Sequence, residues 1–389
     1  MNFIARHLEK ELKQAARYFP AVILTGPRRT GKTTLLRKCF PAASYYLMED
    51  TDMIARIKSD PRAFMDEIRL PVILDEIQNV PEIFNYVRSK IDHAPQKAGQ
   101  WILTGSQEPI LMRGVTESMA GRAAILHLWP LSLEESPKVS LSGGGFPEAV
   151  AKPKVSTLWF NSYIQTYLER DVRAISSIRD LATFRRFLSL VASRVGQMLN
   201  RSDIAAPLGV SVPTLSEWLN ILEITQQILL VPPFYENFGK RIVKSPKIYF
   251  SDTGLLCHLL GIENDGELAR SPFLGPIFEN FVAAEIVKKQ INHGKRRELY
   301  YFRDRQGLEV DFVIPIAGRK LFLLEAKASK TPLPKMVEPI ERLKKCLKGV
   351  HTDSFLIYQA SSHVGEAAIE ALAPGVKALP LHRFLEKLS

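Results

Sequence analysis

Five short apolar runs divide the first third of the chain, and polar residues follow each of them. The runs are Ala21–Leu24, Ser44–Leu47, Leu70–Leu74, Gln100–Leu103 and Ala123–Leu128. Short apolar runs with little alternation are typical of strands that are buried on both faces. Because helix-like segments separate the runs, the pattern predicts an α/β domain with a parallel sheet over residues 1–137.

The middle of the chain, residues 138–265, carries longer amphipathic segments. Ser140–Gly145 is rich in Gly and Ser and is interpreted as a flexible joint. Trp159–Val172 is expected to form one long helix. A capped start at Asn200 and a tight turn at Gly209 indicate two further helices that are joined by a short turn.

The second of these helices runs to Leu222 and leads into a strand, Ile228–Val231. Lys240–Lys244 and Lys247–Phe250 are expected to pair with that strand as a basic hairpin. Two helices and a two-stranded wing form a winged helix-turn-helix, a module that binds DNA or other proteins. On DNA, the expected base contacts are Thr214, Ser216 and Glu217, and the expected phosphate contacts are Lys240, Arg241, Lys244 and Lys247.

Residues 266–389 return to alternating helix and strand patterns. Gly275–Lys289 is expected to be an amphipathic helix, and it precedes three strand-like runs. These runs are Leu299–Phe302, Glu309–Ile314 and Leu321–Leu324. The remaining chain reads as a helix, a strand at Ser354–Tyr358 and further helices. The pattern predicts a second α/β domain at the end of the chain.

Charge and composition change this picture only by suggesting a partner and a compartment. The chain has 389 residues and a formal net charge of +11, which favours a nucleic acid or an anionic surface without identifying either. Its 3 cysteines are far apart and form no C-x-x-C pair, as in proteins of the reducing cytosol. The charged N-terminus and the lack of a long apolar stretch predict a cytoplasmic protein with no membrane partner.

The first apolar run ends in a loop with the spacing G-x-x-x-x-G-K-T. Gly26 and Gly31 allow backbone angles that turn successive N–H groups toward a phosphate, and Lys32 can reach the β- and γ-phosphates of ATP. The Thr33 hydroxyl can bind Mg²⁺, and the following helix points its positive dipole end at the anion. A chance Gly-rich turn is the alternative. The predicted ATP-binding residues are Gly26, Pro27, Arg28, Arg29, Thr30, Gly31, Lys32, Thr33 and Thr34.

Two carboxylates follow the third apolar run, as Asp75-Glu76. Ligands of open α/β sheets bind at the carboxyl ends of the strands. Asp75 is therefore expected to hold the Mg²⁺ of ATP, and Glu76 is expected to orient or deprotonate the attacking water. A solvated acidic turn is the alternative, and the phosphate loop upstream favours the metal role.

The order of these motifs resembles a prokaryotic AAA+ ATPase family that carries a C-terminal DUF4143 domain, the AAA_14/DUF4143 family. The segments that carry the resemblance are the phosphate loop, Leu74–Gln78, Leu103–Gln107, Met119–Arg122, Leu128–Glu135 and Gly144–Glu148. Met119 is a small departure from the family's pattern. The resemblance covers nearly the whole chain. It implies ATP hydrolysis with Mg²⁺ and assembly into a homo-oligomer.

The resemblance also implies roles for three polar positions. Ser106, with Gln107, ends a strand like the family's sensor 1, which implies a contact with the γ-phosphate or the water. Arg122 stands where the family has an arginine finger that reaches a neighbouring subunit's nucleotide. Arg170 lies in a segment like the family's YLERD motif, near nucleotide or the next subunit. The respective alternatives are a simple turn, a surface arginine that pairs with an acidic neighbour, and an exposed charge cluster within one helix.

In the last domain, Glu279, Asp311, Glu325 and Lys327 resemble the active site of PD-(D/E)xK nucleases, although the motif's proline is absent. The resemblance implies that Asp311 and Glu325 bind Mg²⁺, that Glu279 completes the metal shell and that Lys327 supports the attacking water. It also implies a fold like that of restriction endonucleases. A nuclease-like fold used only as a docking platform for nucleic acid or protein is the alternative.

These expectations combine into a cytoplasmic AAA+ ATPase that binds ATP, hydrolyses it with Mg²⁺ and acts on or with DNA. Two alternatives stay open. One is an ATP-regulated, metal-dependent DNase whose working site is the C-terminal one. The other is a slow nucleotide switch that recruits DNA or protein partners.

Overall fold

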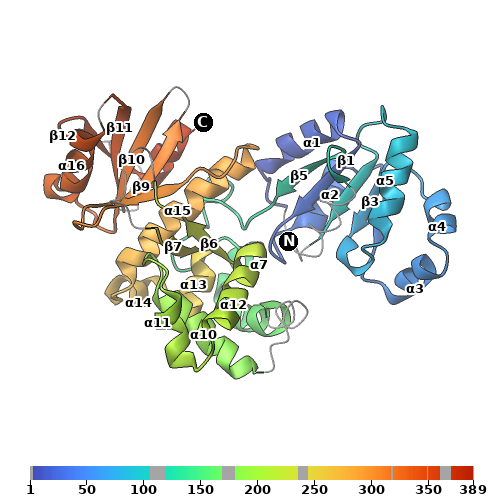
Figure 1. The fold of residues 1–389 in the computed structure, drawn as a ribbon, viewed down its shortest axis with the longest axis horizontal. Coiled ribbons are helices and arrows are strands. Elements are labelled where there is room, and N and C mark those ends of the chain that lie inside the picture. Colours follow the sequence, from blue (N-terminus) through green and yellow to red (C-terminus); the bar gives the residue numbers. More distant parts are fainter. Residues whose placement is uncertain are drawn as a thin grey trace. The chain divides into compact units, whose positions relative to one another are not determined.

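The computed structural model of the chain describes residues 3–105, 119–168, 180–234, 244–316, 319–347, 349–359 and 369–388. The chain divides into two compact units (Figure 1). The N-terminal unit comprises Met1–Leu131 with the short segments Ile224–Gln227 and Ile291–Lys295. The C-terminal unit comprises Ser132–Glu223, Ile228–Gln290 and Arg296–Ser389.

The N-terminal unit is built on a parallel sheet of five strands in the order β2-β3-β4-β1-β5. The strands are β1 (Ala21–Thr25), β2 (Ser44–Leu47), β3 (Val72–Asp75), β4 (Trp101–Thr104) and β5 (Ala123–His127). The predicted parallel sheet is therefore confirmed. Strands β3 and β4 begin and end slightly later than the predicted apolar runs. Their first paired residues are Val72 and Trp101, which follow Pro71 and Gln100.

Helices cover both faces of this sheet (Figure 1). They are α1 (Leu8–Tyr18), α2 (Lys32–Cys39), α3 (Thr51–Ser59), α4 (Pro61–Glu67) and α5 (Ile83–His93), with a 3-10 turn η1 (Ile77–Asn79) after β3. Side chains alternate along each strand. Val22 and Leu24 of β1 accordingly share one core with α1 and α2, while Ala21 and Ile23 share the other core with α4 and α5.

The first part of the C-terminal unit is helical. Its helices are α7 (Pro147–Ala151), α8 (Ser156–Tyr163), α10 (Leu181–Ser193), α11 (Arg201–Leu208), α12 (Val212–Ile224), α13 (Thr253–Leu259), α14 (Asp265–Arg270) and α15 (Leu274–Asn292). The helix expected over Trp159–Val172 is interrupted, because α8 gives way to a π-helix, η4 (Ile164–Leu168). The rest of that segment, with Arg170, lies outside the described residues.

The predicted pair of helices around Gly209 is present. Gly209 ends α11 with a φ of 66°, a left-handed conformation that glycine adopts without strain. Helix α12 follows, and β6 (Ile228–Val231) then pairs antiparallel with β7 (Lys247–Phe250). Residues 235–243 of the predicted wing, including Lys240 and Arg241, lie outside the described part of the chain.

The glycines of Ser140–Gly145 have a different role from the one predicted. A Cβ atom at Gly144 would lie 2.2 Å from Asp252 Oδ1, and one at Gly254 would lie 2.5 Å from the Gly143 carbonyl oxygen. The Gly145 N–H donates to Asp252 Oδ2 at 2.6 Å. The interpretation as a flexible joint is therefore wrong, because these glycines allow the backbone to pack closely against the start of α13.

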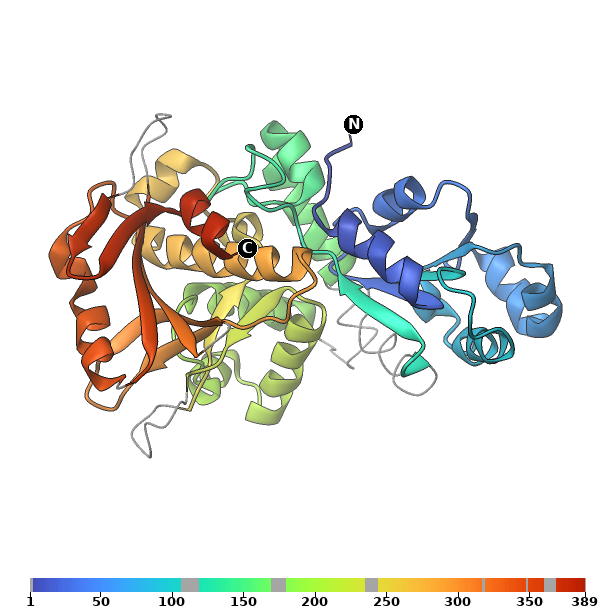
Figure 2. The same cartoon turned by 90° about the horizontal axis from the view of Figure 1, so that it is seen from above.

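The end of the chain forms a mixed sheet in the order β12-β13-β11-β10-β9-β8 (Figure 2). Its strands are β8 (Tyr300–Arg303), β9 (Glu309–Ile316), β10 (Lys320–Lys327), β11 (His351–Tyr358), β12 (Ile369–Ala373) and β13 (Val376–Pro380), with helices α16 (Glu338–Cys346) and α17 (Leu381–Leu385). The second α/β domain is thus present. The region expected to be helical after β11 supplies two more strands before the helix α17.

No helix among the described residues combines the length and the apolar character needed to cross a membrane.

Candidate functional site

The predicted phosphate loop connects the carboxyl end of β1 to the first residue of α2. Lys32, the first residue of α2, is buried, and its Nζ donates to the carbonyl oxygens of Gly26 and Pro27 at 2.9 Å each. The Thr30 hydroxyl donates to the Pro27 carbonyl at 3.0 Å. The loop is therefore curled around the ammonium group of its own lysine, the group that the sequence assigns to phosphate binding.

Both glycines of the loop motif have conformations that other residues rarely adopt. Gly26 has a φ of 143°, and a Cβ atom there would lie 2.2 Å from the Leu128 carbonyl oxygen. Gly31 has a φ of 92° and nothing within 4 Å of such a Cβ, so the space beside it is open. Gly26 therefore serves the close approach of β1 to the chain after β5, while Gly31 leaves room beside the start of α2.

Asp75 ends β3 next to the loop, as predicted, and only 2% of it is exposed. Its Oδ2 accepts hydrogen bonds from the hydroxyl groups of Thr33 at 2.7 Å and Tyr45 at 2.8 Å. Its Oδ1 is buried and has no hydrogen-bond partner among the described residues. Burial raises the pKa of Asp75, and the hydroxyl donors of Thr33 and Tyr45 oppose that rise.

Glu76 has a left-handed backbone conformation, with φ 57° and ψ 45°. This conformation is uncommon for a residue with a side chain and costs about 1–3 kcal/mol. Gln78 Nε2 donates to Glu76 Oε2 at 2.5 Å, and Asn79 Nδ2 donates to the Glu76 carbonyl at 3.0 Å. Glu76 therefore leaves the strand in a strained turn directly after Asp75, and the amide of Gln78 bonds to its carboxylate.

Arg6 is a site residue that the sequence pattern did not reveal. It is 7% exposed, and its guanidinium donates to the Thr30 carbonyl at 2.8 Å and to the Trp129 carbonyl at 2.6 Å. It therefore ties the phosphate loop to the chain that leaves β5. Its only sequence signal is an arginine before an amphipathic helix, which fits many surface positions equally well.

Arg122 directly precedes β5, at the amino edge of the sheet. Because β5 runs parallel to β1, about 16 Å of strand separates it from the phosphate loop of its own chain. Its guanidinium contacts Asp92 at 2.6 and 3.1 Å. The structure thus places Arg122 away from the nucleotide site of its own subunit. Ser106 and Gln107 lie outside the described residues.

These residues fit a nucleotide with its Mg²⁺. The loop supplies a lysine and an open side at Gly31, and the Thr33 hydroxyl lies within hydrogen-bond distance of Asp75. The buried, unpartnered Oδ1 of Asp75 offers a hard oxygen of the kind that Mg²⁺ and its waters prefer.

The C-terminal unit brings the other predicted site residues together. Lys327 Nζ donates to Asp311 Oδ2 at 3.0 Å and also contacts Glu325 Oε2. The backbone N–H of Ala326 donates to the same Asp311 oxygen at 2.9 Å. Glu325 Oε1 is buried without a hydrogen-bond partner among the described residues. Asp311, Glu325 and Lys327 are therefore neighbours, as the sequence predicts.

Glu279 of α15 joins this group through residues of β7. Its Oε1 accepts from Lys247 Nζ at 3.0 Å and from the Tyr249 hydroxyl at 2.5 Å. Lys247 also contacts Glu309 at 2.6 Å, and only 3% of its side chain is exposed. The carboxylates of Glu279, Glu309, Asp311 and Glu325 are called the carboxylate cluster below. The prediction that Lys247 contacts phosphates is therefore wrong, because its side chain is buried inside this cluster.

The lysines set the charge of this cluster. Burial would raise the pKa of Asp311, but Lys327 and Lys247 lower it further than burial raises it. Burial, followed by the charge of Asp311, holds the pKa of Glu325 well above its usual range. In the part of the chain that the structure describes, no group of three or more His, Cys, Asp or Glu residues is arranged to hold a metal ion. Ammonium groups thus neutralise the carboxylates here.

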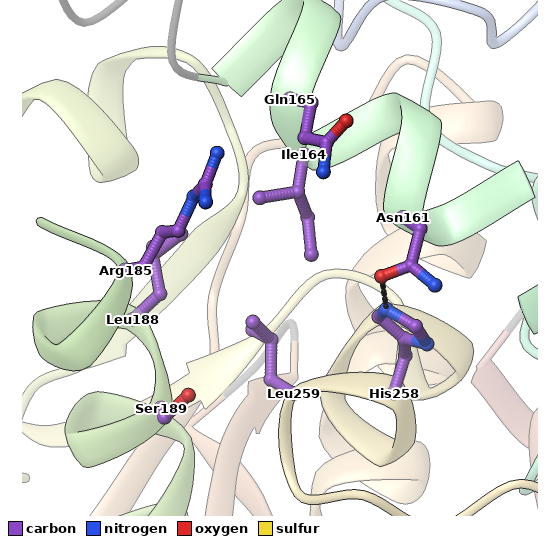
Figure 3. Close-up of a pocket in the computed structure, with 8 residues that line it drawn as sticks. All are labelled: Asn161, Ile164, Gln165, Arg185, Leu188, Ser189, His258 and Leu259. Carbon is purple, nitrogen blue, oxygen red and sulfur yellow. Dashed lines mark hydrogen bonds between the residues drawn. The ribbon is translucent and has the colours of Figure 1, made fainter. Parts of the chain in front are cut away.

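A separate hollow of about 230 Å³ lies among three helical segments of the C-terminal unit (Figure 3). It is lined by Asn161, Ile164, Gln165, Arg185, Leu188, Ser189, His258 and Leu259. His258 Nε2 and Asn161 Oδ1 are 3.2 Å apart, and burial lowers the pKa of His258. None of the residues predicted from the sequence lines this hollow.

Three family models match the chain in succession. An AAA domain matches residues 18–136, and two domains of unknown function, DUF8612 and DUF4143, match residues 138–266 and 274–383. The expected AAA and DUF4143 assignments are confirmed. The sequence patterns gave no expectation of DUF8612.

Curated relatives extend over most of the chain. It is 32% identical to the uncharacterized protein Rv2008c of Mycobacterium tuberculosis over 336 residues, which cover 84% of this chain and 74% of the relative. It is 22% identical to an uncharacterized protein of Haemophilus influenzae over 348 residues, which cover 77% of this chain and 81% of the relative.

Solved structures resemble the chain more weakly. The Walker-type ATPase PABY2304 of Pyrococcus abyssi matches with a TM-score of 0.45 and 16% identity, covering 66% of this chain and 96% of the other. The RuvB Holliday junction branch migration motor of Thermotoga maritima matches with a TM-score of 0.31 and 17% identity, covering 58% of this chain and 89% of the other. Both TM-scores are below 0.5, so neither likeness bears on function or assembly.

Proposed function

This chain, in which an AAA domain precedes a DUF4143 domain, belongs to the same family as the uncharacterized protein Rv2008c of Mycobacterium tuberculosis, and on this premise we propose that it binds ATP and hydrolyses it with Mg²⁺. The single observation that carries the proposal is the geometry around the phosphate loop. Lys32, Thr33 and Asp75 converge at the carboxyl edge of the parallel sheet, and the Thr33 hydroxyl bonds to Asp75 at 2.7 Å.

Each residue of the site has a distinct task in this proposal. Lys32 exchanges its two loop carbonyls for phosphate oxygens, and the N-terminus of α2 adds its dipole. Thr33 and Asp75 hold the metal and its waters. Mg²⁺, when bound, neutralises charge that develops on the phosphate oxygens. Glu76 accepts a proton from the attacking water, or orients that water, from its strained position beside Asp75.

Arg122 supports a further proposal about assembly. It lies at the edge of the sheet opposite the phosphate loop of its own chain, so any contact it makes with a nucleotide belongs to a neighbouring subunit. Reaching that nucleotide requires release of the Asp92 contacts, and an arginine can then clamp a phosphoryl group. We therefore expect a homo-oligomer in which nucleotide sites are completed between subunits.

We propose that hydrolysis is linked to DNA. The formal net charge of +11 and the helix-turn-helix order of α11, α12, β6 and β7 support this proposal. In this interpretation α11 to β7 form a winged helix, with Glu217 and Thr214 on the second helix and Lys244 at the wing. A module that binds protein rather than DNA fits the same order of elements, and the protein then acts as a nucleotide switch.

The first test measures ATP hydrolysis by the full chain with and without DNA. We expect Mg²⁺-dependent hydrolysis that rises several-fold when duplex DNA is added at low salt, because the basic protein gains affinity through counterion release. The stimulation should fall as salt increases. If DNA does not change the rate of ATP hydrolysis at any salt concentration, the protein is an ATPase but DNA is not its partner.

A second candidate function is favoured by the carboxylate cluster. The contacts of Lys327 with Asp311 and Glu325 place a lysine and two carboxylates together, as a metal-dependent DNase of the PD-(D/E)xK type requires. For cleavage, the two carboxylates must exchange their lysine contacts for a divalent cation.

Nicking of supercoiled DNA tests this second function on the same preparations. If it is correct, the wild type nicks DNA with Mg²⁺ or Mn²⁺, and Lys327→Ala lowers the rate by about 100-fold or more. Lys330→Ala is the matched control, since Lys330 is an exposed lysine just beyond β10. Equal nicking by the wild type and Lys327→Ala would point to a contaminating nuclease and reject the candidate.

A further inference from the structure

The Asp75 carboxylate depends on two hydroxyl groups that come from different elements. Thr33 of α2 and Tyr45 of β2 both donate to Oδ2, at 2.7 and 2.8 Å. A buried carboxylate without donors is costly, because burial disfavours its charged form. The two hydroxyl groups therefore satisfy Oδ2 and fix the direction in which the unpartnered Oδ1 points.

These two donors are not equivalent. Thr33 belongs to the phosphate-loop motif, and its oxygen is itself an expected ligand of Mg²⁺. Tyr45 lies outside every motif of the sequence, on the edge strand of the sheet. It is a donor to Asp75 with no other assigned task, so its hydroxyl can hold the carboxylate while Thr33 serves the metal.

The ring of Tyr45 is fixed by its own contacts. The Arg37 guanidinium of α2 lies 4.9 Å from the ring centroid, within the range of a cation–π contact. Strand β2 pairs with β3 so that Tyr45 lies opposite Ile73, two residues before Asp75. The position of the hydroxyl group is therefore set by a strand pairing and by a contact with α2.

The neighbouring Tyr46 lies on the same strand but makes no contact of this kind with Asp75. Side chains alternate along β2, so Tyr46 faces the other core, where its ring lies 5.3 Å from that of Phe64. Tyr46 and Tyr45 thus share their residue type, strand and local exposure, but only Tyr45 bonds to Asp75. The two tyrosines therefore allow a direct comparison between Tyr46, which packs in the core, and Tyr45, which contacts Asp75.

We propose that Tyr45 is a positioning residue that orients Asp75 toward Mg²⁺ and thereby sets the Mg²⁺ concentration at which the nucleotide site works. The proposal rests on the proposed ATPase function. Tyr45 touches neither nucleotide nor metal in this scheme. It acts through Asp75, so its loss should affect the metal requirement more than nucleotide binding without metal.

The test compares wild type, Tyr45→Phe and Tyr46→Phe in the full chain. Phenylalanine keeps the ring and the Arg37 contact and removes only the hydroxyl. Hydrolysis is measured at saturating ATP while Mg²⁺ is varied, and binding of a fluorescent ATP analogue is measured with EDTA. For Tyr45→Phe we expect the half-saturating Mg²⁺ concentration to rise about 10-fold, the usual scale for a hydrogen bond to a charged group. Tyr46→Phe should match the wild type, and affinity in EDTA should be the same for all three.

Several outcomes would overturn the proposal. One is an unchanged Mg²⁺ requirement in Tyr45→Phe, and another is an equal shift in both variants, which would indicate general loosening of β2. A fall in affinity in EDTA for Tyr45→Phe alone would place the tyrosine in nucleotide binding instead. Failure of the ATPase proposal appears separately, as a wild type that neither binds nor hydrolyses ATP. If the wild type binds ATP without hydrolysis, the Mg²⁺ dependence is read from binding.

Discussion

Glu76→Gln is expected to slow ATP hydrolysis by at least about 100-fold while ATP binding stays within about 2-fold of the wild type, since a general base contributes about 10²–10⁴-fold. Glutamine keeps the size and hydrogen-bonding reach of the side chain but cannot take a proton. Single-turnover hydrolysis and equilibrium binding of the same preparation measure the two quantities. The variant should accumulate as a stable ATP complex.

The geometry explains why the effect should be this selective. Glu76 is held in a left-handed conformation by its surroundings, and Gln78 bonds to its carboxylate at 2.5 Å. Such strain persists only where the surrounding structure enforces it, and it is concentrated at functional positions. In the proposed site the neighbouring Asp75 holds the metal, so removing the charge of Glu76 should leave the nucleotide contacts in place.

Glu82→Gln is the matched control, because Glu82 is an exposed carboxylate a few residues along the same chain segment and makes no cap hydrogen bond to α5. It should hydrolyse ATP at the wild-type rate. Hydrolysis by Glu76→Gln at more than about a tenth of that rate would show that another group activates the water. The slow-switch function would gain support if wild type and Glu76→Gln were equally slow.

The sequence alone predicts the N-terminal sheet and the convergence of the phosphate-loop motif with Asp75 well, because both depend on local signals. The buried strands are uninterrupted apolar runs, and Gly26, Gly31 and Lys32 have a fixed spacing. The carboxylates after β3 are likewise adjacent to their strand in the sequence. Parallel strands place their carboxyl ends at one edge, so the motifs converge without any knowledge of tertiary contacts.

The supporting residues could not be predicted, because their partners are distant in the sequence. Arg6 bonds to Trp129, and Tyr45 bonds to Asp75. No periodic pattern distinguishes such an arginine or tyrosine from an ordinary surface or core residue. Their roles follow only once the strand order β2-β3-β4-β1-β5 brings them together.

The same limit explains two of the errors in the C-terminal unit. Lys247 stands in a basic segment, which suggested a surface that contacts phosphates, but Glu279 and Glu309 neutralise it in the interior. The glycines near Gly144 suggested flexibility, although Asp252 and Gly254 pack against them. Composition reveals that a residue is charged or small, and only the fold reveals whether that property serves burial or exposure.

Gly26→Ala is expected to destabilise the nucleotide-free protein by about 2–6 kcal/mol, the sum of about 1–3 kcal/mol of backbone strain and about 1–3 kcal/mol of overlap with a neighbouring group. The added Cβ would lie 2.2 Å from the Leu128 carbonyl oxygen, and the φ of 143° is strained for alanine. Relief requires β1 to move from the chain after β5, where the Leu128 N–H bonds to the Thr25 carbonyl at 2.8 Å. Hydrogen exchange of β1 and β5 and the apo melting temperature measure the effect.

Gly31→Ala is the control for Gly26→Ala, because it also changes a glycine of the loop motif but adds no overlap with a neighbouring group. Its φ of 92° also strains alanine, but nothing lies within 4 Å of the added Cβ. Its cost should therefore be only the backbone strain of about 1–3 kcal/mol. Both variants alter the phosphate loop, so both should bind ATP less well, and stability without nucleotide distinguishes them. Equal destabilisation would mean that the contact of Gly26 with Leu128 relaxes at little cost and that the glycine is required for phosphate binding alone.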